Sequence, residues 1–533
     1  MSWDAIVVGS GFGAAFAARP LVEAGLRVLL LERGRRVTRS PESWAPHEAA
    51  QLSQHYNTEP GWMVEDGHGR STTGGFFCLG GPSVFYGGVS LRFRAEDFHP
   101  PAEIVGDSGA AWPWDYAELE PWYAEVERAL GVAGEAGVDP TEPPRSTNYV
   151  AAPKPLAPIS AKLTDAARAL GYHPFRLPLA LNYSTSTDET DRSKDEADGR
   201  GVCIECGTCD GFACAISAKN DVATVVLPAL VAQGLEVRTG HAVTRILADD
   251  TRVTGVESVD VATGTREVHQ ARAVILAAGT LATPQILFNS QLSTRNSAQS
   301  AVGAYLTRHI NRIVFGLFAK RPDPENRHHK QVGIHDLYFP VGSGKWEVGR
   351  IGGLQSLVTP PVSLVRAQVP KFVGPIAARL VPHLTGLLAI AEDQPQAQNR
   401  ISVIPGKHDA LGLPTILIRH QYTERDERAV GILADAGQRI LRKAGALAFY
   451  RHRIWTFSHA LGTVRMGIDP RTAPLDGAGC YRGVENLVIT DGSALPTSAS
   501  VNPSLTIAAT ALRAGTLLAQ RLTRVAAVSS TTT

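Results

Sequence analysis

The chain begins with glycines whose spacing is typical of phosphate binding. Gly9-Ser10-Gly11-Phe12-Gly13-Ala14 follows the apolar run 5–8 and precedes a segment with helical composition that ends near Gly25. In this G-x-G-x-x-A pattern the first glycine permits a tight turn, the second lets a pyrophosphate reach the backbone, and the small last residue lets the helix pack closely. Glu32 ends a second apolar run about 20 residues further on, where a carboxylate can accept hydrogen bonds from a ribose. The pattern predicts a dinucleotide-binding βαβ unit.

Four of the six cysteines have a spacing that favours chemistry of another kind. Cys203, Cys206, Cys209 and Cys214 form a C-x2-C-x2-C-x4-C pattern. Thiolates at such short intervals can converge on one metal ion or cluster. The spacing is close to that of bacterial ferredoxins but differs from it, and no proline follows Cys214. Three alternatives stay open, namely an iron–sulfur cluster, a zinc site, and thiols that are buried or paired as disulfides. A reducing compartment would disfavour the disulfides.

Two more apolar strands end in glycine junctions of the same kind. Residues 273–276 run into Ala278-Gly279, and residues 487–490 run into Asp491-Gly492. A last helix is predicted after Asn502, which is a good N-cap and is followed by a proline suited to the first helical position. Such junctions, far apart in the sequence, indicate one sheet to which the chain returns. We therefore expect an α/β protein with a Rossmann-like dinucleotide-binding domain that is discontinuous in sequence.

The 533 residues are too many for one core and suit two or three compact units. We assign residues 1–100, 200–298 and 455–524 to the dinucleotide-binding domain. Residues 101–199 and 299–454 form a substrate or cap domain, whose strand-like segments predict a mainly antiparallel sheet with a lid. The tail 525–533 is expected to be disordered.

Charge and hydropathy argue against several functions. The formal charge is +1, with 52 basic and 51 acidic residues, which gives no support for binding to nucleic acid. The first strand begins about four residues in, so no secretory signal is expected. No apolar run of about 18 residues predicts a spanning helix, and we expect a cytoplasmic protein. Residues 365–391 are apolar but broken by prolines, and they either cover a substrate cavity or touch a membrane surface.

Five stretches of the chain resemble the glucose–methanol–choline (GMC) family of flavin oxidoreductases. They are GSGFGAA with Glu32, LGGPSVFYGG, AAGTLATPQIL, HALGTVRMG and DGSALPTSASVNPSLTIAATAL, which occur in that order between residues 5 and 520. The middle of the chain matches only loosely, as at AEDQPQAQNRISV, residues 391–403. The resemblance implies an FAD cofactor and the oxidation of a primary or secondary alcohol to a carbonyl compound.

The same motifs supply the residues expected to contact FAD. The stretch 71–98 carries aromatic residues beside its glycines, which suits a backbone that lies against a flat ring system. The resemblance implies FAD contacts from Gly9, Gly11, Phe12, Gly13, Ala14, Glu32, Arg33, Gly80, Gly81, Ser83, Tyr86, Gly87, Val243, Ala278, Gly279, Asp491, Gly492, Asn502, Pro503 and Ser504.

The resemblance places His459 beside the flavin as the catalytic base and Asn502 on the substrate hydroxyl. Alcohol oxidation by a flavin moves a hydride from carbon to flavin N5 while a base takes the hydroxyl proton. A histidine, with a usual pKa of about 6.5, suits that task near neutral pH. Asn502 can donate to and accept from an alcohol oxygen without carrying charge. Some relatives have a second histidine in place of this asparagine, so the chain resembles the His/Asn subset, as in cholesterol and choline oxidases.

The four-cysteine segment resembles the corresponding region of membrane-linked sugar and sugar-acid dehydrogenases, some of which contain an iron–sulfur cluster. Such a cluster would carry electrons to an external acceptor, and oxygen need not be the oxidant. Two alternative functions stay open. One is a lyase of the hydroxynitrile type, which keeps FAD without redox turnover, and the other is an electron-transfer subunit that works through the cysteines. The substrate stays open between a sterol or other lipophilic alcohol and a sugar.

Overall fold

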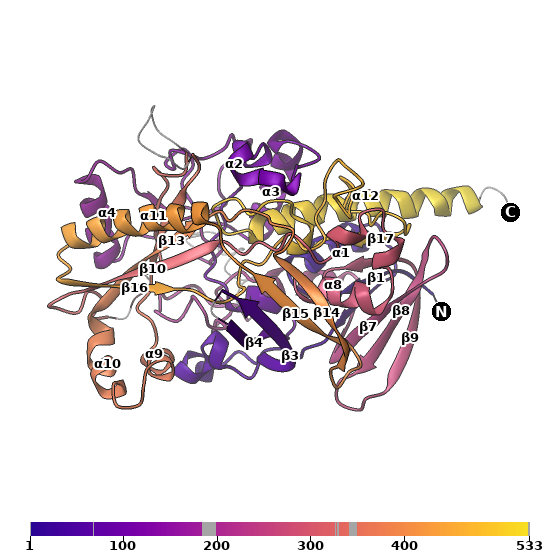
Figure 1. Ribbon diagram of the computed structural model, residues 1–533, viewed down its shortest axis with the longest axis horizontal. Coiled ribbons are helices and arrows are strands. Elements are labelled where there is room, and N and C mark those ends of the chain that lie inside the picture. Colours follow the sequence, from indigo (N-terminus) through magenta and orange to yellow (C-terminus); the bar gives the residue numbers. More distant parts are fainter. Residues whose placement is uncertain are drawn as a thin grey trace.

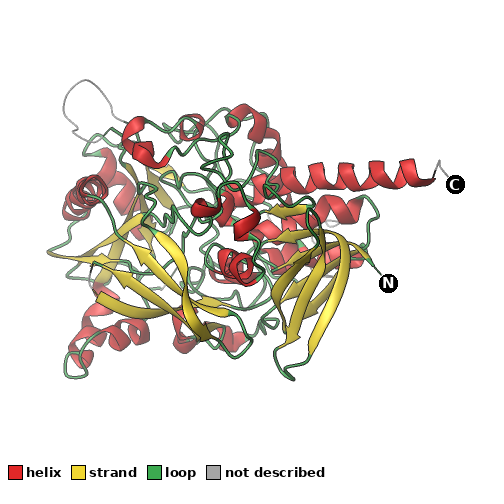
Figure 2. Cartoon of the chain, turned by 45° about the vertical axis from the view of Figure 1, so that its right-hand side comes forward, coloured by secondary structure: helices red, strands yellow, loops and turns green. Residues whose placement is uncertain are grey.

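A computed structural model describes residues 2–67, 69–183, 199–325, 327, 330–339 and 349–530 of the chain. These residues form three β-sheets with helices packed around them (Figure 1, Figure 2). The N-terminus lies beside the first sheet. The last helix carries the C-terminal end out past the rest of the molecule, at the right of Figure 1.

The first sheet contains, within the described residues, β1 (Trp3–Val8), β2 (Val28–Glu32), β6 (Glu236–Thr239), β7 (His241–Ala248), β8 (Val253–Asp260), β9 (Arg266–Leu276) and β17 (Leu487–Ile489). The strand order is β6-β2-β1-β9-β8-β7, and β17 also pairs with β9. β1 pairs in parallel with β2 and β9, and β9 pairs in parallel with β17. β7 and β8 extend the sheet as an antiparallel hairpin. Strands from three distant parts of the chain build this sheet, which confirms the expected α/β fold class.

Helices α1 (Phe12–Glu23) and α12 (Ser504–Ser530) pack against each other beside this sheet (Figure 1). They lie so close that a Cβ atom added at Gly515 would be 2.3 Å from the carbonyl oxygen of Ala17. α1 continues through Pro20 to its end. α12 extends past residue 525, where we expected a disordered tail to begin, and residues 531–533 lie outside the described part of the chain.

The second sheet contains β5 (Phe175–Arg176), β10 (Ile310–Leu317), β11 (Val332–Ile334), β12 (Gly352–Leu357), β13 (Leu384–Ala391) and β16 (Ala448–Arg453). Its strand order is β16-β10-β13-β12-β11-β5, and each described pair is antiparallel. Helix α11 (Glu424–Lys443) covers the sheet with a buried face that includes Val430, Leu433 and Ile440. This arrangement confirms the mainly antiparallel sheet expected for the substrate domain.

A third, smaller sheet contains β3 (Tyr56–Asp66), β4 (Gly69–Phe76), β14 (Arg400–His408) and β15 (Pro414–His420) in the order β14-β15-β3-β4. β3 pairs in parallel with β15 and in antiparallel fashion with β4. It therefore joins two segments that we assigned to different domains from the sequence.

The other helices are α2 (Ala102–Val105), α3 (Tyr116–Ala129), α4 (Pro158–Arg168), α6 (Val222–Val225), α7 (Leu227–Ala232), α8 (Ala282–Asn289), α9 (Val362–Gln368) and α10 (Gly374–Leu380).

The apolar, proline-broken segment 365–391 divides into two parts with different surroundings. Its last residues form β13, which is buried in the second sheet. α9 and α10 instead form a hairpin at the lower left of Figure 1, where Phe372 is 82% exposed and Ile376 is 61% exposed. Within the described residues, no helix combines the length and the apolar character that crossing a membrane requires.

Candidate active site

The glycines of the N-terminal motif lie where distant parts of the chain meet. Gly9 has a φ of +94°, and a Cβ atom there would be 2.4 Å from the carbonyl oxygen of Ala277. A Cβ atom at Gly13 would be 2.2 Å from the carbonyl oxygen of Thr490. A Cβ atom at Gly11, by contrast, would have no described atom within 4 Å. Packing therefore requires glycine at 9 and 13. Gly11 leaves open space at the N-terminus of α1, whose N–H groups and dipole suit a phosphate.

Glu32 is buried at the end of β2, next to this open space. Ser10 Oγ donates to its Oε2 at 2.5 Å, and the N–H group of Gly34 donates to its Oε1 at 2.7 Å. Burial raises the pKa of Glu32 to about 7. A carboxylate offers about four acceptor positions, so Glu32 keeps capacity for further donors such as ribose hydroxyl groups. The arrangement fits the adenosine end of a dinucleotide.

The predicted glycine-rich segment lies directly on the N-terminal motif. The N–H group of Gly80 donates to Ser10 Oγ at 2.9 Å, and a Cβ atom at Gly81 would be 3.6 Å from Cα of Gly11. Ser83 closes the segment on itself, because its Oγ donates to the carbonyl oxygen of Gly80 at 2.7 Å. Two of the predicted cofactor-binding segments are therefore adjacent in space.

Tyr86 and Gly87 continue this segment. The ring of Tyr86 meets the ring of Phe12 edge-on, with centroids 5.3 Å apart. A Cβ atom at Gly87 would be 2.9 Å from Asp210 Oδ1 and 3.0 Å from Lys330 Nζ. These two side chains form an ion pair of 2.6 Å. A residue of the cysteine segment and a lysine near β11 thus cover Gly87.

Asp491 joins the second and third glycine junctions. Its Oδ2 accepts from the N–H group of Gly279 at 2.9 Å and from Thr283 Oγ1 at 2.5 Å. Burial raises the pKa of Asp491. A Cβ atom at Gly492 would be 2.8 Å from the side chain of Leu461, which lies close in sequence to His459. The two junctions therefore meet beside the loop that carries the predicted base.

The remaining predicted FAD contacts are more dispersed. Ala14 is buried within α1, and Val243 is buried on β7. Arg33 follows β2, with its guanidinium 4.1 Å from the ring centroid of Phe77. Pro503 lies directly before α12, whose first residue is Ser504. These residues lie on elements of the first sheet and its helices, and their contacts with a cofactor stay predictions.

His459 lies in the loop after β16 and contacts a second histidine. Its Nδ1 is 2.9 Å from Nδ1 of His309, and the two ring planes are perpendicular. Nε2 of His309 is 2.8 Å from the carbonyl oxygen of Ser498. Burial lowers the pKa of His459 well below its usual value, and the charge of Lys330, with that of His309 whenever His309 is protonated, lowers it further. His459 is therefore neutral near pH 7 and can accept a proton.

Asn502 lies just before α12 and contacts the second sheet. Gln355 on β12 donates from Nε2 to Asn502 Oδ1 at 2.7 Å. The Gln355 side chain is buried, and its Oε1 has no hydrogen-bond partner among the described residues. The loop before Asn502 is held by Glu392, whose Oε1 accepts from the N–H group of Ala499 at 2.9 Å. The loop that accepts the hydrogen bond from His309 is thus the loop that presents Asn502.

Asp393 is the buried anion behind these residues. It accepts from the N–H groups of Arg308 and His309 at 2.9 and 3.0 Å, from Ser498 Oγ at 3.1 Å, and from His420 Nε2 at 3.2 Å. Burial alone would raise its pKa, but the hydrogen bond and charge of His420, together with the charge of His309, leave the pKa lowered. Asp393, His309 and Gln355 were absent from the predicted site residues. Asp393 lies in the loosely matching stretch 391–403, whereas His309 and Gln355 lie outside the stretches that resemble the family.

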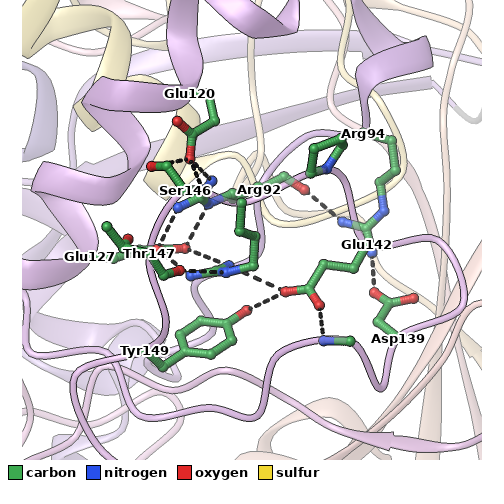
Figure 3. A network of polar contacts seen from close by, with 12 residues as sticks. Arg92, Arg94, Glu120, Glu127, Asp139, Glu142, Ser146, Thr147 and Tyr149 are labelled. Atoms are coloured by element: carbon green, nitrogen blue, oxygen red, sulfur yellow. Dashed lines mark hydrogen bonds and ion pairs between the residues drawn. The ribbon is translucent and has the colours of Figure 1, made fainter.

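A separate ion-pair network ties together the segment 92–149 (Figure 3). Arg92 pairs with Glu127 at 2.8 Å and with Glu120 at 2.9 Å, and Arg94 is hydrogen-bonded to Asp139. The cavity among these residues is about 10 Å³. That volume accommodates about one water molecule. We therefore assign the network to fold stability and not to substrate binding.

The four predicted metal ligands do not form a metal site. In the part of the chain that the structure describes, no group of three or more His, Cys, Asp or Glu side chains is placed to hold a metal ion. Cys203, Cys206, Cys209 and Cys214 are all free. Burial raises the pKa of Cys203 to about 11 and raises that of Cys209 further, which disfavours the thiolate form that metals bind. The iron–sulfur and zinc predictions are therefore unsupported.

Hydrogen bonds to the backbone fix the conformation of the cysteine segment. Lys219 is fully buried, and its Nζ donates to the carbonyl oxygens of Cys209 and Phe212 at 2.9 and 2.6 Å. Cys203 Sγ accepts from the N–H group of Glu205 at 3.4 Å. The thiols stay near enough for their charges to act on one another, but these contacts leave no group of three placed to hold a metal ion within the described residues.

These features define a class of protein, namely an α/β oxidoreductase with a dinucleotide cradle and a second, antiparallel sheet. Residues 182–311 match the N-terminal domain of the GMC oxidoreductases, and residues 395–511 match the C-terminal domain. The chain belongs to the GMC oxidoreductase family, whose members depend on FAD.

Individual relatives cover nearly the whole chain. Paromamine 6'-oxidase of Streptomyces fradiae is 30% identical over 97% of this chain and 91% of that protein. The 2-methyl-1,2-propanediol dehydrogenase of Mycolicibacterium austroafricanum is 25% identical over 97% and 95%. Among solved structures, pyridoxine 4-oxidase from Mesorbium loti superimposes with a TM-score of 0.66 at 18% identity, covering 98% of this chain and 99% of that chain. The last likeness concerns the fold.

Proposed function

We propose that this protein oxidises a primary or secondary alcohol to a carbonyl compound, with His459 as the base and Asn502 as the group that holds the hydroxyl oxygen. One observation supports the proposal most. His459 contacts His309, His309 contacts the carbonyl oxygen of Ser498, and Ser498 belongs to the loop that presents Asn502. The two polar side chains, far apart in sequence, are anchored to one loop.

The chain offers a place for the cofactor on which its family depends. Gly9 and Gly13 form a cradle with no room for side chains, Gly11 leaves open space, and Glu32 keeps acceptor capacity. The N-terminus of α12 adds N–H groups and a positive dipole end after Asn502. FAD, when bound there, supplies the acceptor for the hydride that leaves the alcohol carbon.

The chain's own residues handle the proton. His459 is neutral near pH 7 because its pKa is lowered, so it accepts the hydroxyl proton without first losing one. Asn502 stays uncharged and can hydrogen-bond to the oxygen as negative charge develops there. A positioned base of this kind contributes about 10²–10⁴-fold to the rate.

Polar surroundings favour a hydroxyl-rich substrate over a sterol. Gln355 Oε1, beside Asn502, is a buried acceptor with no partner among the described residues. Asp210 and Lys330 form an ion pair near His459. The pKa of His459 shows this proximity, because the charge of Lys330 lowers it, although less than burial does. A buried acceptor such as Gln355 Oε1 is costly unless a ligand or water satisfies it. We therefore place the substrate in the class of polyols and amino sugars, to which paromamine belongs.

The final oxidant is either oxygen or an external acceptor, because relatives are named both as oxidases and as dehydrogenases. No electron route through the cysteines is proposed. A cytoplasmic location stays a prediction from the sequence.

The test is anaerobic flavin reduction, followed by absorbance, with the holoenzyme and a panel of paromamine, 2-methyl-1,2-propanediol and cholesterol. We expect the polar alcohols to bleach the flavin. His459→Ala should slow this step by about 10³-fold while FAD stays bound. Ser458→Ala changes an exposed neighbour and serves as the matched control. Flavin that stays oxidised while a cyanohydrin is cleaved would instead identify a lyase.

A further inference from the structure

We infer that His309 and Gln355 set the hydrogen-bond polarity of the active site, so that His459 presents a bare Nε2 lone pair and Asn502 presents an N–H group. This inference rests on the proposed function and adds two positioning residues to it. Neither His309 nor Gln355 is assigned contact with the reacting atoms.

The main-chain carbonyl of Ser498 fixes the tautomer of His309, because a carbonyl oxygen can only accept a hydrogen bond. Nε2 of His309 lies 2.8 Å from the carbonyl oxygen of Ser498, so Nε2 must carry the hydrogen. A neutral imidazole has one protonated and one bare nitrogen. His309 is neutral because burial lowers its pKa, an effect that the charge of Asp393 only partly offsets. Nδ1 of His309 is therefore bare and acts as an acceptor.

The tautomer of His459 follows from that of His309. The two Nδ1 atoms are 2.9 Å apart, a hydrogen-bond distance at which one nitrogen must donate. Because Nδ1 of His309 is bare, Nδ1 of His459 carries the hydrogen. Its Nε2 is then left with a free lone pair, which is the form that a base requires.

Asn502 receives its orientation from the second sheet. Gln355 Nε2 donates to Asn502 Oδ1 at 2.7 Å, which occupies the carbonyl side of the Asn502 amide. The amide NH₂ group of Asn502 then remains to donate. Gln355 is 1% exposed and stands on β12, so its own position is fixed by the sheet.

The resulting polarity matches an alcohol that loses its proton. The substrate O–H group donates to Nε2 of His459, and the substrate oxygen accepts from the NH₂ group of Asn502. As the O–H bond breaks, the proton moves to Nε2 and the electron pair stays on oxygen, where the Asn502 donor stabilises it. If the hydrogen bonds ran in the opposite directions, His459 would present an N–H group and Asn502 a carbonyl oxygen to the substrate. No lone pair on His459 would then be available to take the hydroxyl proton.

The backbone of His309 is held in a way that makes a clean substitution available. Its φ is +57°, in the left-handed region, and its N–H group donates to Asp393 while its carbonyl oxygen accepts from the hydroxyl of Tyr422 at 2.8 Å. Asparagine tolerates this conformation better than most residues do. Its Oδ1 is bonded to Cγ, as is Nδ1 of histidine, so it places an acceptor at the same atom position.

The first experiment compares His309→Asn with His309→Leu in the anaerobic reduction assay. Both variants lose the contact with Ser498, but only Asn keeps an acceptor for Nδ1 of His459. We expect the reduction rate to fall by up to about tenfold in His309→Asn and by about 100-fold or more in His309→Leu. FAD content and thermal unfolding are measured for both, because Leu is also strained at this φ. Equal rates in two folded, FAD-bound variants would overturn the role of His309.

The second experiment compares Gln355→Glu with Gln355→Leu. Glutamate has the shape of glutamine but can only accept when ionised, so it would turn the Asn502 amide and present Oδ1 to the substrate. Leucine removes the partner and leaves the amide free to rotate. We expect the more conservative Gln355→Glu to be the slower enzyme of the two. A purely structural role predicts the reverse order, and that order would overturn the role of Gln355.

The two failures can be told apart by His459→Ala. If that variant reduces its flavin at the unchanged rate, the proposed function itself fails. If His459→Ala is slow while His309→Asn and His309→Leu behave alike, only the inference about polarity fails.

Discussion

The proposed nucleotide-binding end and the proposed catalytic end of this protein are held together by different kinds of contact. At the nucleotide end, main-chain atoms meet directly, since carbonyl oxygens occupy the space where Gly9 and Gly13 would carry a Cβ atom. At the catalytic end, buried side chains meet instead, through hydrogen bonds that link His459 to His309 and Asp393 to both His309 and His420. We expect substitutions at the first end to affect folding and FAD retention, and substitutions at the second to affect rate.

The largest effect is expected at Gly13. In Gly13→Ala the new Cβ would lie 2.2 Å from a main-chain carbonyl oxygen, so the strand junction must move. We expect little folded, FAD-containing protein, with a loss of stability of about 4 kcal/mol or more. Gly11→Ala is the matched control, because its Cβ meets no described atom within 4 Å. It should weaken FAD binding while the apoprotein stays folded. Absorbance ratios of flavin to protein and thermal unfolding check both results, and similar behaviour of the two variants would contradict the steric argument.

Asp393→Asn tests whether the catalytic end also depends on a buried charge for stability. The amide loses part of the acceptor capacity that serves two N–H groups, a serine hydroxyl and His420. We expect a loss of about 3 kcal/mol in the free energy of unfolding, together with slower flavin reduction. Urea unfolding measures the first effect, with the exposed Asp250→Asn as control. An unchanged unfolding curve would mean that Asp393 contributes nothing to holding this end together.

Glu32→Gln tests an ionisable group at the proposed nucleotide end that has a raised pKa and a proposed ligand, the ribose. The pKa of Glu32 is about 7 in the folded protein and about 4.3 in the unfolded chain. Protonation of Glu32 therefore stabilises the folded protein fully below about pH 4, and this stabilisation is lost as the pH rises through 7. At pH 8 the Gln variant apoprotein should be more stable than wild type, by up to about 3 kcal/mol. Its FAD affinity should nevertheless fall by about tenfold, because an acceptor for the ribose is lost.

Unfolding of the apoprotein at pH 5 and pH 8 and titration with FAD check these two effects of Glu32→Gln. The exposed Glu59→Gln is the control. If the Gln variant is no more stable than wild type at pH 8, the folded state does not raise the pKa of Glu32.

The smallest effect on the protein itself is expected in the turn between α9 and α10, which lies outside both ends. Phe372→Ser changes an exposed ring, so the free energy of unfolding should change by less than about 0.5 kcal/mol. Lys371 in this turn and Arg379 on α10 are also exposed, and an apolar and cationic helix suits an anionic lipid surface. Co-sedimentation with phosphatidylglycerol vesicles should therefore decrease in Phe372→Ser. The exposed Val268→Ser, far away on β9, is the control, and equal binding by all three proteins would exclude membrane contact through α10.

The packing of the proposed nucleotide end could be predicted from the sequence because its requirements are local, while its cofactor contacts stay predictions. Gly9, Gly13 and Glu32 lie within one strand–helix–strand unit, and the packing of that unit selects the residues. The same reasoning found the later junctions at Gly279 and Asp491, which repeat the local pattern.

The polarity of the catalytic end could not be predicted in this way. His309, Ser498 and Gln355 stand in segments without periodicity, and only the tertiary fold brings them to His459 and Asn502. The cysteine segment is the opposite case, because a recognisable local pattern led to a metal-site prediction that the structure does not support. Its spacing is a strong local pattern, but contacts of buried Lys219 with backbone carbonyls decide where the thiols lie. The third sheet was missed for the same reason, because β3 and β15 are distant in sequence.

The position of β9 between β1 and β17 has a consequence for biosynthesis. β1 is synthesised long before residues 487–489, which pair with the carboxyl end of β9 on the side away from β1. At about 5–20 residues per second, those residues emerge roughly 25–100 s after β1. Until then the carboxyl end of β9 beyond its pairing with β8 is an unpaired strand edge, which is a site for aggregation of the incomplete chain.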